Sequence, residues 1–267
     1  MIVAVLAAAL ALLAPKPATL VAVGDIASCG STGDEATAAL VAKSPGTVAL
    51  LGDISYERGT AEELARCYAP AWGRFRKQTR AALGNHDYGA GTAAAAIAYF
   101  GLPARGYYSY DLGAWHAVAL NSNCWAAGGC AAGSPQERWL RADLAAHPVA
   151  CTLAYWHHPR WSSGLHGSSD AVAGLWDALA AGGADVVLAG HDHDYERFAP
   201  IDGIRSFVVG TGGRSHYSVF RRTAGSEVVD FQTYGVLRLT LRADGYDWRF
   251  LPAAGGTFTD AGSGSCR

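Results

Sequence analysis

The sequence has few charged residues and no strong excess of either sign. Charged residues make up 16% of the 267 residues, and the formal net charge is −2. Such a chain has no electrostatic footprint for nucleic acid or for an acidic membrane surface, so we expect no nucleic-acid partner apart from nucleotides as substrates. Half of the residues are hydrophobic, which excludes a mainly disordered chain and favours one domain with a full core.

Cysteine spacing typical of a thiolate metal site is also missing, since no two cysteines form a Cys-x-x-Cys pair. An even set of six favours disulfides in an oxidising compartment, with six buried free thiols as the alternative. Cys124 and Cys130 flank a glycine-rich loop and are the first predicted pair. The other two pairs would complete the set, although the sequence does not fix them: Cys29–Cys67 and Cys151–Cys266.

No apolar run is long enough to span a bilayer. Residues 1–14 are apolar without a break, but a spanning helix needs about 20 residues, so we expect no stable membrane insertion. The run resembles the hydrophobic part of a secretory signal, although no Lys or Arg precedes it. We therefore predict a signal peptide at 1–17, a single domain at 18–267 and an extracellular location; a retained structural segment is the alternative.

Strand-like and helical patterns alternate in the first half of the chain. We predict strands at 19–23, 47–51 and 79–83, separated by helices at 34–43 and 60–76, which favours parallel pairing. The second half predicts a hairpin, two helices and several further strands. These lie at 107–111 with 115–121, at about 135–146 and 171–181, and at 151–156, 184–189, 204–210, 217–220, 227–231, 236–241 and 246–251.

Five of the apolar runs end in a polar cluster. In chain order the clusters are Gly24-Asp25, Gly52-Asp53-Ile54-Ser55-Tyr56, Gly84-Asn85-His86-Asp87, Trp156-His157-His158-Pro159 and Gly190-His191-Asp192-His193. The carboxyl ends of strands are where open α/β sheets bind ligands, so we expect these clusters to meet. Carboxylate, amide, phenol and imidazole groups without thiolates suit Fe, Mn or Zn. The number of candidate ligands is too large for one ion and matches two ions that share a carboxylate.

The five motifs, in this order, resemble the metallophosphoesterase (calcineurin-like) superfamily. Gly52-Asp53-x-x-Tyr56 resembles its purple acid phosphatase branch, and Asp25-Ile26-Ala27 lacks the His that follows the first Asp in most of the superfamily. Loss of that His with gain of Tyr56 is the pattern of the purple branch. The resemblance implies an α/β fold of two mixed β-sheets packed face to face and flanked by helices. It is closest to small single-domain members, so we expect a monomer.

The resemblance also implies a ligand set for two ions, Fe(III) and a divalent Fe, Zn or Mn. Asp25, Tyr56 and His193 would hold the trivalent iron, Asp53 would bridge, and the divalent ion would be held by Asn85, His157 and His191. His86, with Asp87 orienting its ring, would contact phosphate or protonate the leaving alcohol. His166, nine residues after His157, falls where plant members place a substrate-contacting histidine, and His158 is left outside the metal set.

The implied reaction is hydrolysis of a small phosphate monoester by attack of metal-bound hydroxide. Two alternatives remain open, a phosphodiesterase or nucleotidase with the same metals and an inactive metal-containing binding protein. Three other polar residues are predicted to take no part in catalysis. We expect Arg197 to be an ion-pair partner, and His116 and His147 to be non-catalytic.

Overall fold

The computed structural model describes residues 16–219 and 221–267. The predicted signal peptide at 1–17 therefore lies almost wholly outside the described residues. No described helix is long and apolar enough to cross a membrane.

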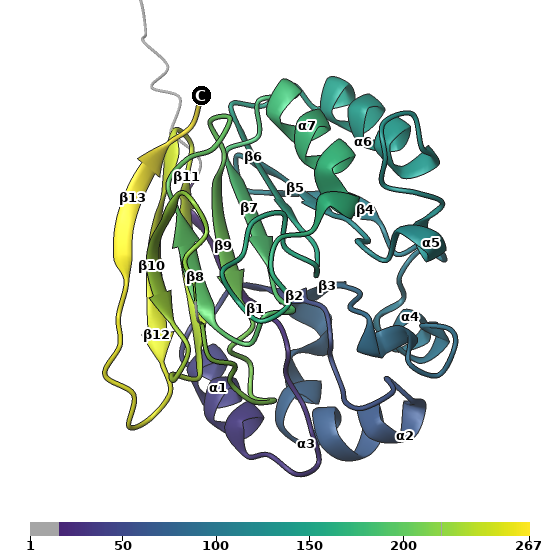
Figure 1. Ribbon diagram of the computed structural model, residues 1–267, viewed down its shortest axis with the longest axis vertical. Helices are drawn as coiled ribbons and strands as arrows, with labels where there is room; N and C mark the ends of the chain where they lie inside the picture. The colour runs from purple at the N-terminus through teal and green to yellow at the C-terminus, as the bar shows by residue number, and fades with distance from the viewer. Residues whose placement is uncertain (1–15, 220) are drawn as a thin grey trace, which may run out of the picture.

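Two mixed β-sheets face each other and are flanked by helices on both outer sides (Figure 1). In the described part of the chain, the six-stranded sheet has the order β13-β12-β11-β1-β2-β3 and the seven-stranded sheet the order β10-β8-β9-β7-β6-β5-β4. The predicted fold class is thus confirmed. The strands are β1 (Ala18–Val23), β2 (Thr47–Leu51), β3 (Thr79–Ala82), β4 (Tyr108–Leu112), β5 (Trp115–Ala119), β6 (Cys151–Tyr155), β7 (Val186–Ala189), β8 (Tyr195–Phe198), β9 (Arg205–Val209), β10 (Ser226–Asp230), β11 (Gly235–Arg242), β12 (Gly245–Pro252) and β13 (Ala261–Ser265).

The strands that carry the polar clusters run parallel within their sheets. β1, β2 and β3 pair in parallel in one sheet, and β5, β6, β7 and β9 do so in the other. Parallel strands covered on both faces read as nearly continuous apolar runs, which is why these segments were recognisable in the sequence. Their carboxyl ends meet at the same edge, where the clusters begin.

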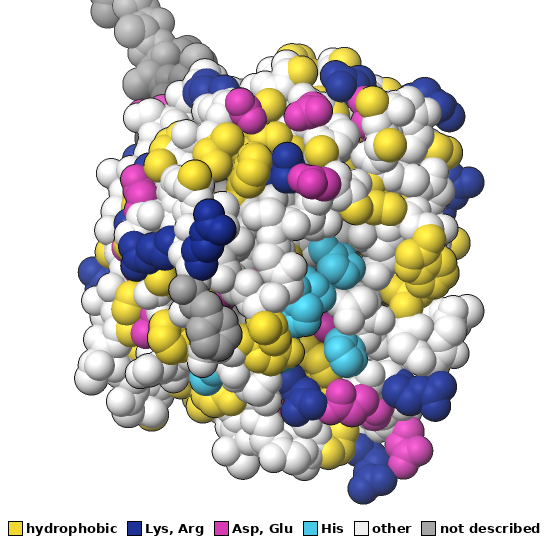
Figure 2. Space-filling model, in the orientation of Figure 1, with side chains coloured by type: hydrophobic (Ala, Val, Ile, Leu, Met, Phe, Trp, Pro, Cys, Tyr) yellow, Lys and Arg dark blue, Asp and Glu magenta, His cyan; other side chains and the backbone are white. Residues whose placement is uncertain are grey.

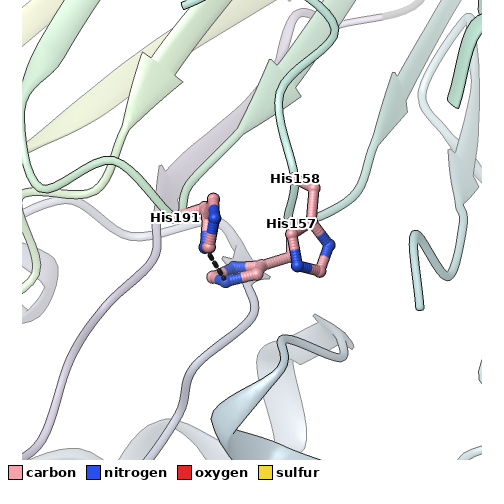
Figure 3. Close-up of side chains that lie close together, drawn as sticks. All are labelled: His157, His158 and His191. Carbon is pink, nitrogen blue, oxygen red and sulfur yellow. Dashed lines mark hydrogen bonds between the residues drawn. The ribbon is translucent and has the colours of Figure 1, made fainter. Parts of the chain in front are cut away.

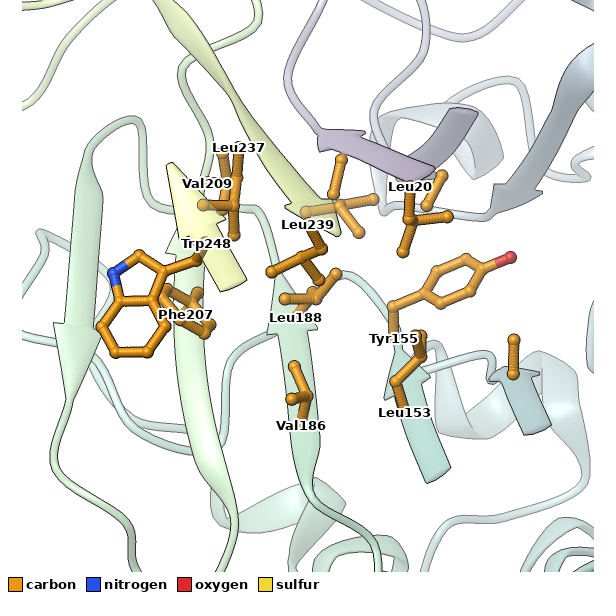
Figure 4. Packing of buried hydrophobic residues seen from close by; sticks show 14 of the residues in the cluster. Leu20, Leu153, Tyr155, Val186, Leu188, Phe207, Val209, Leu237, Leu239 and Trp248 are labelled. Carbon is orange, nitrogen blue, oxygen red and sulfur yellow. The ribbon is translucent and has the colours of Figure 1, made fainter. Parts of the chain in front are cut away.

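Three apolar layers hold the four structural layers together. The central one lies between the sheets and includes Leu20, Leu188 and Leu239, all buried (Figure 4). A second packs the six-stranded sheet against α1 (Gly33–Ala42) and the helices around Trp72, and a third packs the other sheet against α6 (Pro135–Ala146) and α7 (Ala173–Ala181). The sheets are therefore fixed against each other by burial on both faces of each.

The predicted helix at 60–76 forms, but it is not a single regular helix. It runs as α2 (Ala61–Glu63), a π-turn (Leu64–Tyr68), α3 (Ala69–Trp72) and a 3₁₀ segment (Gly73–Gln78). Thr60 and Glu63 form a capping box at its start. Pro70 has no N–H to donate, so the regular hydrogen-bond ladder is interrupted around it.

Several other expectations need correction. Residues 217–219 form no strand, and residue 220 lies outside the described residues. Two strands were not predicted: β8, which continues directly from the last polar cluster, and β13, which lacks large apolar residues. Nor were α4 (Ala94–Phe100), α5 (Cys124–Ala127) and the 3₁₀ turns His86–Tyr88 and Asp170–Val172.

All six cysteines are paired in the described structure. The pairs are Cys29–Cys67, Cys124–Cys130 and Cys151–Cys266, as the sequence suggested without fixing two of them. The last bridge spans 115 residues and ties β6 to the C-terminus. Three disulfides are consistent with an extracellular protein.

Candidate metal centre

The five clusters meet at one edge of the two sheets. Asp25, Asp53 and Asn85 follow β1, β2 and β3 of the six-stranded sheet, while His157 and His191 follow β6 and β7 of the other. Figure 2 shows histidine side chains gathered on the corresponding face of the molecule. The carboxylates thus come from one sheet and the imidazoles from the other.

Backbone strain is concentrated at the same residues. Asp25, Asp53 and His191 have φ values of 61°, 50° and 73°, a region that non-glycine residues rarely adopt. Such strain persists where the surrounding structure imposes it, and it is typical of functional sites. Here the sharp turns after the strands aim three polar side chains back at one point.

Tyr56 is the centre of the first group of ligand atoms. Its hydroxyl oxygen lies 2.8 Å from Oδ1 of Asp25, 3.0 Å from Oδ2 of Asp53 and 3.2 Å from Nε2 of His193. Nε2 of His193 also lies 3.4 Å from Oδ1 of Asp25. Four groups from three separate segments therefore converge, in the arrangement that the resemblance implied for the trivalent ion.

His157 is the centre of the second group. Its Nε2 lies 3.0 Å from Oδ1 of Asn85, 3.2 Å from Nδ1 of His191 and 3.3 Å from Oδ2 of Asp53. Its Nδ1 faces the carbonyl oxygen of Leu51 at 2.8 Å, which holds the ring in place. Oδ2 of Asp53 belongs to both groups, which suits the predicted bridging role.

The donor set fits two metal ions. Bonds of about 2.0–2.2 Å place neighbouring ligand atoms about 3 Å apart, which is the spacing seen in both groups. Asp25 and Asp53 are buried carboxylates beside one another, an arrangement that is costly without a cation. These observations support the predicted ligand set, although the identity of the ions remains a prediction.

The surroundings of each group explain its altered acidity. Burial raises the pKa of Tyr56 well above its usual range, and the charges of Asp25 and Asp53 raise it further. Burial lowers the pKa of His157, but the adjacent Asp53 outweighs it and brings the pKa to about 9. The pKa of His191 is lowered by burial and by the neighbouring His157. The phenol is thus surrounded by negative groups that attract a cation.

His86 lies at the mouth of the site. Its ring packs on Tyr56 with ring centres 4.4 Å apart, its Nδ1 is 2.7 Å from the carbonyl oxygen of Glu57, and its Nε2 is 4.0 Å from Oδ2 of Asp53. Its side chain is 33% exposed, so Nε2 can reach a substrate. The position suits the predicted contact with phosphate or the leaving alcohol.

Asp87 occupies a different place from the one we expected. Its buried carboxylate accepts N–H bonds from Asp53, Ile54 and Gly84 at 3.0, 3.1 and 2.8 Å, and no contact with the His86 ring is present among the described hydrogen bonds. The ring of His86 is held by Glu57 instead. Asp87 therefore positions the backbone beneath the carboxylate of Asp53.

His166 lies beside the second group on a glycine-rich loop. Its ring packs on His191 with centres 4.3 Å apart, and its Nδ1 is 3.0 Å from Oδ1 of Asp192. Its side chain is 40% exposed. This position suits a substrate-contacting role, which stays a prediction.

His158 lies closer to the site than the sequence suggested. Its ring stands beside those of His157 and His191, and one ligand atom from each of the three lies within 4.8 Å of the others (Figure 3). Its Nδ1 is 2.8 Å from Oγ of Ser122, and burial, with His157 second, lowers its pKa to about 3. A third imidazole therefore borders the group around His157, and the exclusion of His158 from the metal set stays a prediction.

Several supporting residues were not recognisable from the sequence because their contacts are long-range. Ser215 Oγ lies 2.7 Å from Nδ1 of His193, whose ring stacks on Tyr217 at 4.1 Å. The guanidinium of Arg214 lies 5.1 Å from the centre of the Tyr56 ring. Arg197, in contrast, pairs with Asp260 at 2.7 Å, which confirms its structural role.

A two-sheet α/β sandwich with carboxylates and imidazoles gathered at its strand ends is typical of the metallophosphoesterase class. The model of the calcineurin-like phosphoesterase family matches residues 4–195, and the chain belongs to that family.

The similar proteins include phosphatases. The tartrate-resistant acid phosphatase type 5 of Rattus norvegicus is 35% identical over 78 residues, which are 29% of this chain and 24% of that protein, so the match covers about a quarter of the relative. A purple acid phosphatase from yellow lupin (Lupinus luteus) seeds has a TM-score of 0.73 at 18% identity, over 93% of this chain and 53% of that one.

Two further structures share the fold. GAP50, the anchor in the inner membrane complex of Plasmodium, has a TM-score of 0.76 at 14% identity, over 94% of this chain and 90% of that one. A dimetal phosphatase from Danio rerio has a TM-score of 0.59 at 13% identity, over 91% of this chain and 99% of that one.

Proposed function

We propose that this protein is a secreted phosphatase that hydrolyses small phosphate monoesters with the help of two metal ions. The observation that carries the proposal is the convergence of Tyr56 with Asp25, Asp53 and His193 at hydrogen-bond distances. A phenol among two carboxylates and an imidazole suits a hard trivalent ion such as Fe(III), and the group around His157 suits a divalent Fe, Zn or Mn. When bound, such a pair of ions activates water and neutralises charge on the phosphoryl oxygens.

The chain's own residues would complete the reaction. Nε2 of His86 faces the site and would contact the phosphate or donate a proton to the departing alcohol oxygen. His166 would contact the substrate from the other side, with its ring orientation fixed by the buried carboxylate of Asp192. Asp87 would hold the backbone of Asp53, and with it the shared carboxylate, in place.

Two other functions deserve comparison. A phosphodiesterase or nucleotidase would use the same ligands. The relative rates on mono- and bis-nitrophenyl phosphate distinguish it from a monoesterase, and we expect the monoester to be the better substrate. A non-catalytic binding protein is the second alternative, because the Plasmodium protein of similar fold is described as an anchor. The complete ligand set of this chain favours catalysis.

The main experiment replaces the shared carboxylate. We expect Asp53→Asn to lower kcat on nitrophenyl phosphate by about 100-fold or more and to reduce the bound metal, because one side chain serves both ligand groups. Asp170→Asn, at an exposed carboxylate, is the matched control and should behave as wild type. Full turnover with both ions retained in the Asp53 variant would refute the proposed site.

Two further measurements test the finer parts of the proposal. An iron-loaded protein should show a visible absorption band from the Tyr56 phenolate, and Tyr56→Phe should abolish it. Secretion is tested by N-terminal sequencing of protein from the culture medium, which should begin near residue 18. A mature protein that begins at Met1 would contradict the signal peptide.

A further inference from the structure

A second cluster of potential metal ligands lies far from the strand ends described above. His116 stands near the start of β5, opposite Thr152 of β6, whereas His157 follows the other end of β6. Asp143 and His147 lie one turn apart at the C-terminal end of α6. The cluster is therefore at the opposite edge of the seven-stranded sheet from the candidate metal centre.

The cluster brings two imidazoles to one carboxylate. Nε2 of His116 lies 2.8 Å from Oδ2 of Asp143, and Nδ1 of His147 lies 3.5 Å from Oδ1 of the same side chain. One ligand atom from each residue lies within 4.8 Å of the other two. Since metal bonds of about 2.0–2.2 Å put adjacent ligands about 3 Å apart, small side-chain rotations would admit an ion.

Neighbouring groups orient these ligands as the partners of metal-binding side chains commonly do. Oδ1 of Asp111 lies 3.0 Å from Nδ1 of His116, which directs the other ring nitrogen at Asp143. Oγ of Ser109 donates to Oδ1 of Asp143 at 2.7 Å. A carboxylate behind the histidine and a hydrogen bond to the ligating carboxylate are both features of built metal sites.

Burial and charge also suit a cation. The side chains of His116 and Asp143 are 1% and 9% exposed, while that of His147 is 39% exposed and leaves a route from solvent. Two carboxylates, Asp111 and Asp143, would balance the charge of one divalent ion. The second imidazole, His147, stacks on the ring of His116 at 4.1 Å, and its Nδ1 lies 2.8 Å from the backbone carbonyl oxygen of Asp143, a contact that a bound ion would replace.

We propose that His116, Asp143 and His147 form a separate site for one divalent transition-metal ion, with Zn²⁺ as the representative ligand and water at the exposed position. Imidazole and carboxylate donors suit Zn²⁺ in a four-coordinate site with one open position. The bound ion would fasten the end of α6 to the β4–β5 hairpin. The site would be structural and independent of phosphatase activity.

The test counts zinc in the full-length protein. Wild type, His147→Gln and the exposed-surface control Asp177→Asn are saturated with ZnCl₂, freed of loose metal by gel filtration and analysed for zinc. We expect His147→Gln to hold one zinc fewer per chain than the other two, with unchanged turnover of nitrophenyl phosphate. The thermal midpoint of wild type should also rise with added zinc more than that of the variant.

A second variant shows whether a loss of zinc reflects a weakened site or a folding defect. Asp111→Ala keeps all three ligands and removes the carboxylate that orients His116, so zinc affinity should fall by about 10- to 100-fold without loss of the fold. Equal zinc content and equal thermal response in wild type and both variants would overturn the proposal. That result would leave the dinuclear centre unaffected, because none of its ligands is changed.

Discussion

A methyl group at residue 84 should disable the candidate metal centre without replacing any of its proposed ligands, because it would displace one of them. A Cβ built on Gly84 would meet the carboxylate carbon of Asp53 at 2.8 Å, and would lie even closer to Oδ1 and to the backbone N–H of that residue. Side-chain rotation alone cannot relieve this contact, because the backbone of Asp53 is involved. The same backbone is tied to Asp87, so it has little freedom to retreat.

The size of the effect follows from the required displacement. Restoring normal contact moves the Asp53 carboxylate by about 1 Å, and an error of that size in a catalytic site costs about 100-fold in rate. Overpacking of this kind also lowers the free energy of unfolding by about 1–3 kcal/mol. We therefore expect Gly84→Ala to fold, to bind metal poorly and to lose about 99% of kcat/KM.

The assay compares kcat/KM on nitrophenyl phosphate, metal content and urea unfolding for wild type, Gly84→Ala and Gly30→Ala. Gly30 is the matched control because a Cβ there would meet nothing within 4 Å. If Gly84→Ala kept kcat/KM within about threefold of wild type and both ions, the shared role of the Asp53 carboxylate would be refuted.

Three further outcomes follow from the structure. Burial, with the charge of Glu35 second, raises the pKa of Asp34 to about 7 from 3.8, so the folded state holds a proton that the unfolded state releases. The folded state of wild type therefore has its full stability below pH 4 and loses part of it as the pH rises toward 7, because the buried carboxyl group must ionise. Asp34→Asn carries no such group, so urea titrations should show it gaining stability over wild type across this range. His166→Ala should lower kcat/KM by about 10- to 100-fold with unchanged metal content, and a loss of metal would reassign it. Cys266→Ser should cost about 5 kcal/mol in urea unfolding and Cys130→Ser about 2, because the broken loops differ in length, and equal costs would contradict the loop-entropy reasoning.

Much of the fold was predictable because its central strands are buried on both faces. The runs that became β1, β2, β6 and β7 are continuous and apolar, and each ends in a glycine or aromatic residue followed by a ligand. β13 has the sequence Ala-Gly-Ser-Gly-Ser and shows neither alternation nor bulk, so only its pairing with β12 defines it. Local pattern carries no information about such a strand.

The site was predictable to the extent that ligands follow strands. Tyr56 and His193 are separated by 137 residues yet lie 3.2 Å apart, and the motifs were enough to expect this. The orientation of His86 was not, because the carbonyl oxygen that holds its ring comes from Glu57 and no side-chain pattern encodes it. Ser215 and Tyr217 were missed for a related reason, since they reach His193 from an irregular loop in a segment predicted in part to be a strand.

The division of donors between the sheets has a consequence for how the protein would acquire the proposed metal ions. Among the proposed ligands, the segments that follow β1–β3 supply only oxygen donors, and the segments that follow β6 and β7 supply only imidazoles. Neither set alone matches the proposed centre, so tight binding of the two proposed ions would require the two sheets to have docked. The metal content of the protein would then measure the fraction in which the two sheets have docked, and the bound ions would oppose separation of the sheets.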